Sequence, residues 1–143
     1  MVSQLLGPNL FDLMRTLGGR FTASTSLNLG MKILNILRFF HDRGFLHRDI
    51  KPTNFCVGQD EYEDEIYIID YGLSKKYIFE ETQTHIPFQI KQQFVGSVRY
   101  ASSNCLEGLT ISRRDDCESF FYMLVEFAQG NLPWSFTMKG PDV

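Results

Sequence analysis

The sequence lacks the features that mark secreted, membrane-spanning and nucleic-acid-binding proteins. Its three cysteines are widely spaced and form no C-x-x-C pair, which is typical of free thiols in a reducing compartment. No apolar run approaches the roughly 18 residues of a membrane span, and the first residues lack the basic segment of a signal peptide. A net charge of −3 gives no basic surface for nucleic acid. We therefore expect an intracellular protein, cytoplasmic or nuclear, that binds neither membranes nor nucleic acids.

Length and composition indicate one domain. At 143 residues, with 43% apolar and 14% aromatic residues, the chain is long enough to bury a hydrophobic core. It contains no internal repeat and no low-complexity segment. We expect a monomer.

Apolar residues recur at helical spacing in three stretches. The first runs over residues 10–17, and the second begins after Thr22 and ends at Gly44. The third, residues 116–128, is apolar on nearly every face, which predicts a buried central helix ending at Gly130. The second stretch carries two adjacent apolar rows, which predict a helix covered on more than one side. One of these rows consists of Leu27, Met31, Leu34 and Leu37.

Two short strands and a long irregular segment complete the pattern. Residues 55–57 and 66–69 are predicted strands, and the acidic link over residues 59–65 is typical of a solvated hairpin turn. Residues 73–111 show little periodicity, which favours a long functional loop.

The two most informative motifs lie between the second helix and this loop. One is His47-Arg48-Asp49-Ile50-Lys51-Pro52-Thr53-Asn54, and the other is Asp70-Tyr71-Gly72. They are similar to the H-R-D-x-x-x-x-N and D-F-G motifs of protein kinases. Phosphoryl transfer needs a carboxylate that accepts the proton of the attacking hydroxyl, and Asp49 is placed for this. Asn54 and Asp70 are oxygen donors suited to Mg²⁺. The alternative for Asp49 is a turn carboxylate bound by backbone amides.

Across nearly its whole length the chain resembles the casein kinase 1 group of Ser/Thr protein kinases. The activation segment is the most discriminating part, because Ser102-Ser103-Asn104 stands where most kinases have Ala-Pro-Glu. Residues 44–47 and 122–128 look closer to the tau-tubulin kinase branch. The other segments that carry the resemblance are Leu5-Leu6-Gly7-Pro8-Asn9-Leu10, Gly96-Ser97-Val98-Arg99-Tyr100-Ala101 and Ser112-Arg113-Arg114-Asp115-Asp116.

This resemblance implies an α+β, protein-kinase-like fold made mostly of the helical large lobe. It also implies ATP and Mg²⁺ as cofactors and assigns roles to individual residues. Asp49 would accept the proton, Lys51 would neutralise the γ-phosphate, and Asn54 and Asp70 would hold Mg²⁺. The hinge backbone at Leu6 would pair with adenine and Asp12 would meet the ribose; the alternatives are a strand core residue and a surface carboxylate. His47, Arg48 and Asp116 would support the catalytic loop. Arg99 would bind an acidic or phosphorylated flank of a protein substrate, the alternative being a structural salt bridge.

The sequence departs from the protein-kinase motifs at two points, which limits what can be expected of its activity. Tyr71 stands where phenylalanine is usual, and the sequence has no Gly-rich phosphate loop and no V-A-I-K-like lysine. We therefore expect residues 1–143 to be a partial kinase domain that comprises the hinge, the catalytic loop, the activation segment and the central helix of the large lobe. The small lobe is expected to be absent from this chain. By itself the chain should then have negligible kinase activity. Two alternatives are an inactive kinase-like binding module and a small-molecule phosphotransferase. Lys51 and the long segment through residues 99–104 favour a protein substrate.

Overall fold

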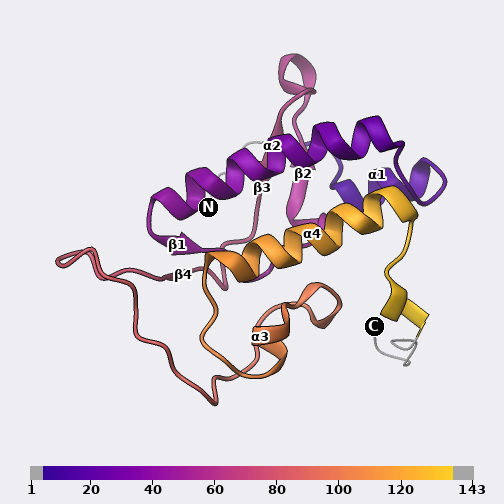
Figure 1. Cartoon of the computed structure of the whole chain (residues 1–143). Helices are drawn as coiled ribbons and strands as arrows, with labels where there is room; N and C mark the ends of the chain where they lie inside the picture. Colours follow the sequence, from indigo (N-terminus) through magenta and orange to yellow (C-terminus); the bar gives the residue numbers. More distant parts are fainter. Residues whose placement is uncertain (1–4, 137–143) are drawn as a thin grey trace.

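The computed structural model describes residues 5–136, which combine helices with two small antiparallel sheets (Figure 1). The helices are α1 (Leu10–Thr16), α2 (Ala23–Asp42), α3 (Ser103–Leu106) and α4 (Arg113–Gln129). The strands are β1 (Phe45–Leu46), β2 (Phe55–Val57), β3 (Ile66–Ile68) and β4 (Lys75–Lys76). The predicted α+β class is confirmed. No helix in this described part is long and apolar enough to cross a membrane.

The helix boundaries follow from capping residues in the sequence. The Thr22 hydroxyl accepts a hydrogen bond from the Thr25 amide at 3.1 Å and begins α2. Gly44, with φ +81°, follows the end of α2, and Gly130, with φ +85°, ends α4. Both glycines adopt the left-handed conformation that a helix end of this kind requires. The predicted ends of the second and third helices are therefore confirmed.

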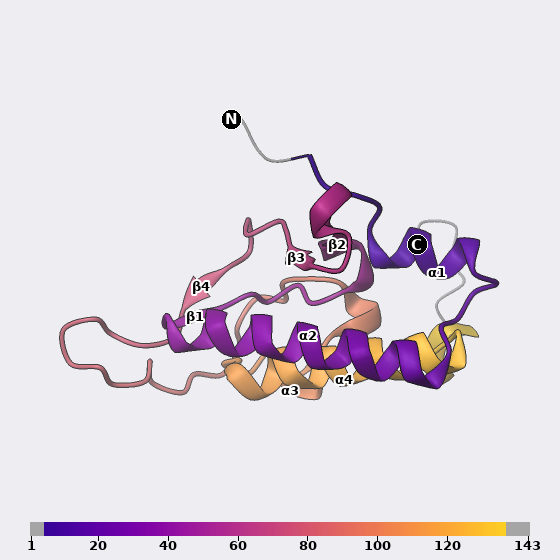
Figure 2. The same ribbon diagram turned by 90° about the horizontal axis from the view of Figure 1, so that it is seen from above.

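Helices α2 and α4 pack side by side and form the main layer, with the two small sheets behind them (Figures 1 and 2). Gly30 permits the close approach, since a Cβ there would lie 3.0 Å from the Leu124 side chain. Ile33 and Leu37 of α2 and Met123 and Phe127 of α4 are fully buried at this contact. Their burial fixes α4 against α2, and α4 in turn carries the acidic side chains of the site described below.

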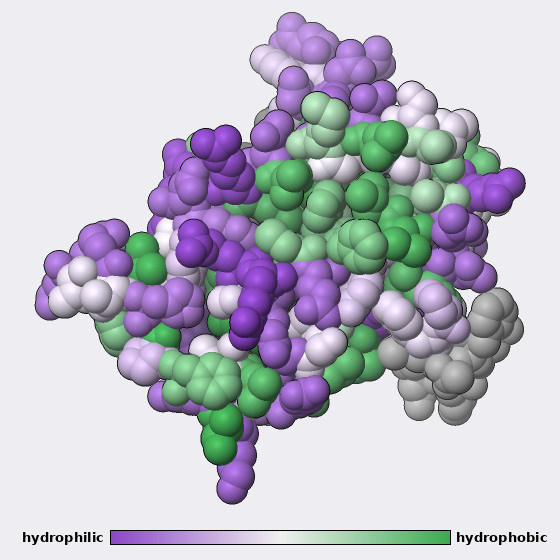
Figure 3. Space-filling model, viewed as in Figure 1, coloured by the Kyte–Doolittle hydropathy of each residue, from purple (hydrophilic) through white to green (hydrophobic). Residues whose placement is uncertain are grey.

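The row of Leu27, Met31, Leu34 and Leu37 in α2 is covered only at Leu37 in the described structure. Leu27, Met31 and Leu34 are 63%, 68% and 49% exposed, and Phe121 of α4 is 58% exposed. Figure 3 shows apolar surface over the face formed by these two helices. The expectation of a second covered row is therefore wrong for α2 in residues 5–136, because periodicity identifies an apolar face without identifying what packs on it. The predicted burial of α4 is confirmed at its apolar positions from Phe120 to Phe127, with Phe121 as the exception.

The sheets bring the two motifs together. Strands β2 and β3 pair with Phe55 opposite Ile68, as the predicted hairpin requires. The Ile69 amide donates to the Asn54 carbonyl at 2.9 Å, so the residue before Asp70 is tied to the end of the catalytic loop. Strands β1 and β4 pair on the other side of that loop. The segment of residues 73–111 is mostly irregular, as predicted.

Candidate active site

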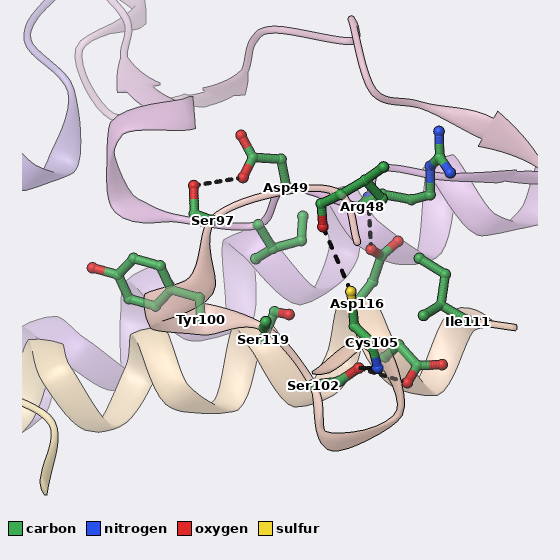
Figure 4. Close-up of a pocket in the computed structure, with 13 residues that line it drawn as sticks. Arg48, Asp49, Ser97, Tyr100, Ser102, Cys105, Ile111, Asp116 and Ser119 are labelled. Atoms are coloured by element: carbon green, nitrogen blue, oxygen red, sulfur yellow. Dashed lines mark hydrogen bonds between the residues drawn. The ribbon is translucent and has the colours of Figure 1, made fainter. Parts of the chain in front are cut away.

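The catalytic loop begins in a strained conformation that a buried carboxylate holds. Arg48 has φ +69°, a conformation that is costly for a residue with a side chain. The Asp116 carboxylate accepts hydrogen bonds from the backbone amides of His47 and Arg48, both at 2.9 Å. Figure 4 shows the bond from the Arg48 amide. Asp116 lies in the first turn of α4 and is 3% exposed. The central helix thus fixes the backbone that leads into Asp49.

Asp49 is the centre of a hydrogen-bond network. Its Oδ1 accepts from the Ser97 hydroxyl at 2.8 Å, and its Oδ2 lies 2.7 Å from Lys51 Nζ. Lys51 Nζ also donates to Ser97 Oγ at 3.1 Å. Figure 4 shows Asp49 and Ser97 pointing toward one another from the catalytic loop and the activation segment. Burial raises the pKa of Asp49, but the hydrogen bonds from Lys51, Ser97 and Asn54 outweigh it, so the pKa lies below its usual value.

Gly96 brings the activation segment close enough for this network to form. Its φ is +94°, and a Cβ there would lie 2.4 Å from the Arg48 carbonyl oxygen. No rotation of a side chain can relieve a clash with a backbone atom. A glycine is therefore required both by the conformation and by the close approach of the two segments.

We expect Gly96→Ala to lower the free energy of unfolding by about 1–3 kcal/mol more than Gly18→Ala. Gly18 is the matched control, because its φ is +87° but nothing lies within 4 Å of the added methyl. The difference between the two variants isolates the clash from the conformational strain that they share. Urea unfolding curves measure it, and equal losses would contradict the close approach.

Asn54 and Asp70 are suited to a divalent cation. Asn54 Nδ2 donates to the Asp49 carbonyl at 2.8 Å and to Asp49 Oδ2 at 3.2 Å, which fixes the amide with its nitrogen toward Asp49. Asp70 has φ +62° and is exposed, so its carboxylate projects from a constrained turn. Residues 5–136 contain no cluster of three or more His, Cys, Asp or Glu that could hold a metal. Two oxygen donors fit Mg²⁺, which keeps waters and takes phosphate oxygens.

The two residues predicted for nucleotide binding lie along β2. The Gly7 amide donates to the Val57 carbonyl at 2.9 Å, which places Leu6 beside the end of β2. The Leu6 carbonyl accepts from Gln59 Nε2 at 3.2 Å. Asp12 lies exposed in α1 and accepts from Asn9 Nδ2 at 2.8 Å. The structure leaves both nucleotide roles as predictions.

The predicted supporting residues occupy different environments. His47 is fully buried, its Nε2 lies 3.3 Å from the Ile69 carbonyl, and its ring contacts the ring of Tyr71. Burial lowers the pKa of His47, which favours a neutral ring. Tyr71 stands where phenylalanine is usual, and its hydroxyl donates to the Ile68 carbonyl at 2.8 Å. The added hydroxyl therefore has a partner.

Arg99 has an internal partner. Its Nε and Nη2 both donate to Glu126 Oε1, and Glu126 is 1% exposed. The Tyr100 hydroxyl donates to the other oxygen of the same carboxylate. Burial by itself lowers the pKa of Arg99, but Glu126 outweighs it and the pKa lies above its usual value. The geometry matches the structural salt bridge, and the role in binding a substrate anion stays a prediction.

Three residues of the site received no role from the sequence. Ser97 lies within a motif that was recognised, yet nothing in the sequence shows that its hydroxyl meets Asp49. Glu126 is the one charged residue in the apolar run of residues 120–128, and a charge there signals a buried partner. Asp115 is 3% exposed and accepts from Ser102 Oγ at 2.8 Å and Asn104 Nδ2 at 2.9 Å. This pairing explains how the Ser102-Ser103-Asn104 segment is anchored to α4.

The arrangement can accept a proton from an attacking hydroxyl at Asp49, with a cation beside it at Lys51 and one metal-ligand candidate, Asn54, hydrogen-bonded to it. A family model, described as the protein kinase domain, matches residues 1–140. The match covers nearly the whole chain, so the chain belongs to the protein kinase family. Members of this family transfer a phosphoryl group from ATP with the help of divalent metal ions.

Proposed function

We propose that this member of the protein kinase family transfers the γ-phosphoryl group of ATP to serine or threonine residues of proteins. We place it in the casein kinase 1 group, closest to the tau-tubulin kinase branch, on the motifs quoted above. The network of Asp49, Lys51, Ser97 and Asn54 is the observation that supports catalysis. An inactive relative has no need to keep an ionised carboxylate, its cation and both metal-ligand positions together.

Each side chain has a defined task in this mechanism. The Asp49 carboxylate orients the substrate hydroxyl and accepts its proton, and its lowered pKa keeps it ionised at neutral pH. Lys51, held between Asp49 and Ser97, places a positive charge where negative charge develops on the transferred group. Mg²⁺ bound by Asn54 and Asp70 would neutralise charge on the β- and γ-phosphates.

For the substrate we propose serine or threonine with acidic or phosphorylated neighbours. Arg99 keeps 29% of its side chain exposed beside Glu126. Arg48, Lys75 and Lys76 line a hollow of about 70 Å³ beside the activation segment. Lys76 is paired with Glu80, while Arg48 and Lys75 leave positive charge at the hollow that would attract an acidic partner at long range.

One observation favours a second function, that of an inactive binding module. The exposed apolar face of α2 and α4 is of the kind that marks interaction sites. These two hypotheses predict different outcomes in a transfer assay.

The assay compares the 143-residue chain with the same chain joined at its N-terminus to the small lobe of a casein kinase 1 group kinase. With radiolabelled ATP and casein, we expect background transfer by the chain by itself and clear transfer to serine and threonine by the fusion. Asp49→Asn should lower transfer by the fusion about 10²- to 10⁴-fold, the usual contribution of an acid–base group. Asp42→Asn, which changes a carboxylate on the exposed side of α2, should have no effect.

A fusion that binds Mg²⁺ and ATP and yet transfers nothing would contradict the proposal and support the binding module. Phosphoamino-acid analysis separates serine and threonine from tyrosine. A panel of acidic and neutral peptides tests the proposed preference, and equal turnover of both would remove it.

A further inference from the structure

A buried histidine that has no role in the sequence motifs contacts the carboxylate that holds the catalytic loop. His41 lies in the last turn of α2, and its side chain is 8% exposed. Its Nε2 lies 2.9 Å from Asp116 Oδ2, the same oxygen that accepts from the His47 amide. The other oxygen, Oδ1, accepts from the Arg48 amide. The ring nitrogen thus shares the carboxylate with the two backbone amides at the start of the loop.

The activation segment also contacts His41, through Tyr77. The Tyr77 hydroxyl donates to the His41 carbonyl at 2.8 Å, and the two rings lie edge to face. Tyr77 is 6% exposed, and its own amide donates to the Gly44 carbonyl at 2.9 Å. Tyr77 therefore fastens the beginning of the activation segment to the end of α2. His41 is the residue common to this contact and to the Asp116 carboxylate.

We propose that His41 is a positioning residue that couples the anchoring of the activation segment at Tyr77 to the backbone of the catalytic loop through Asp116. The importance of this coupling for phosphoryl transfer rests on the proposed function. The coupling itself is a property of the fold, and it can be measured without catalysis.

The geometry explains why the histidine is needed. A carboxylate held only by two neighbouring amides can rotate about its side-chain bonds and still keep one of them. A third donor, fixed by the end of a long helix, leaves a single orientation in which all three bonds form. Arg48 adopts a strained φ of +69°, so the loop relaxes when this orientation is lost. When the contact at Tyr77 is lost, the end of α2 shifts. The His41 ring transmits this shift to Asp116 and so to the catalytic loop.

The test is amide hydrogen exchange of the 143-residue chain, followed residue by residue by NMR. In His41→Ala we expect the His47 and Arg48 amides to exchange about tenfold faster or more, while Ile33 and Met123 in the core keep their rates. His41→Gln should restore slow exchange, because the amide nitrogen of glutamine can replace Nε2. His41→Asn, whose amide is too short, should resemble alanine. Asp42→Ala, in the same turn but exposed, is the matched control and should change neither amide.

The coupling is tested by Tyr77→Phe, which removes only the hydroxyl. We expect it to speed exchange at His47 and Arg48 in the wild-type background and to add nothing in the His41→Ala background, where the side chain that bonds Asp116 is missing. An equal effect in both backgrounds would refute the relay.

Faster exchange of all amides to the same degree in His41→Ala would show a purely structural histidine, and unchanged rates at His47 and Arg48 would overturn the proposal outright. If His41→Ala does not fold, the exchange rates of the His47 and Arg48 amides in His41→Gln and His41→Asn are compared instead. Equal rates in these two variants would overturn the proposal. None of these results depends on ATP, so the proposed function can fail while the positioning role stands.

Discussion

Replacing Glu126 by alanine is expected to cost about 3–5 kcal/mol of unfolding free energy, the usual loss when one partner of a buried ion pair is removed. The carboxylate is 1% exposed and accepts hydrogen bonds from Arg99 and Tyr100. Without it, the Arg99 guanidinium and the Tyr100 hydroxyl lose their buried acceptor beneath the activation segment. Denaturation in urea, followed by tryptophan fluorescence, measures the loss.

A double variant separates the broken pair from the lost packing. Arg99→Met combined with Glu126→Leu removes both charges and should lose less stability than Glu126→Ala by itself. Asp42→Ala removes an exposed carboxylate paired with Arg38 and should change stability by no more than about 0.5 kcal/mol. If the double variant is as unstable as Glu126→Ala, the buried pair is not the source of the loss.

Asp116→Asn is expected to lower stability by about 3 kcal/mol although the two side chains have nearly the same shape. Both oxygens of Asp116 accept from N–H groups, Oδ1 from the Arg48 amide and Oδ2 from the His47 amide. An asparagine therefore has to point its NH₂ group at a donor in either orientation. The measurement is again urea unfolding, and amide exchange at His47 and Arg48 should rise with it.

The control for Asp116→Asn is Asp42→Asn, the same chemical change at a carboxylate that is 65% exposed. We expect no measurable loss from it. A similarly small loss for Asp116→Asn would mean that the loop does not depend on the carboxylate, and the account of how the strained Arg48 is held would then be wrong.

The motifs and helix boundaries were readable in the sequence because they depend on nearby residues. The H-R-D-x-x-x-x-N pattern places Asn54 five residues after Asp49, and the structure joins these two side chains directly. The hairpin of β2 and β3 follows from two apolar runs separated by an acidic link. Capping by Thr22 and the left-handed Gly130 also act within one turn of the chain.

The contacts across long stretches of sequence were decided by the tertiary structure. Ser97 meets Asp49 across 48 residues, and His41 meets Asp116 across 75. Neither residue type carries a local signal, since serine and histidine suit many positions. The same limit applies to Leu27, Met31 and Leu34, whose spacing marks an apolar face that remains exposed among the described residues.

By itself the sequence determined that this chain belongs among phosphoryl-transfer domains, because Asp49, Asn54 and Asp70 stand in fixed spacing that their chemistry requires. Only the tertiary structure decided that Arg99 pairs with Glu126, that Ser97 completes the Asp49 network, and that α4 anchors both the catalytic loop and the activation segment. The physical reason is that a buried charge must find its partner in space. That partner is set by how the activation segment packs on α4 and on the catalytic loop, which no local pattern of residues encodes.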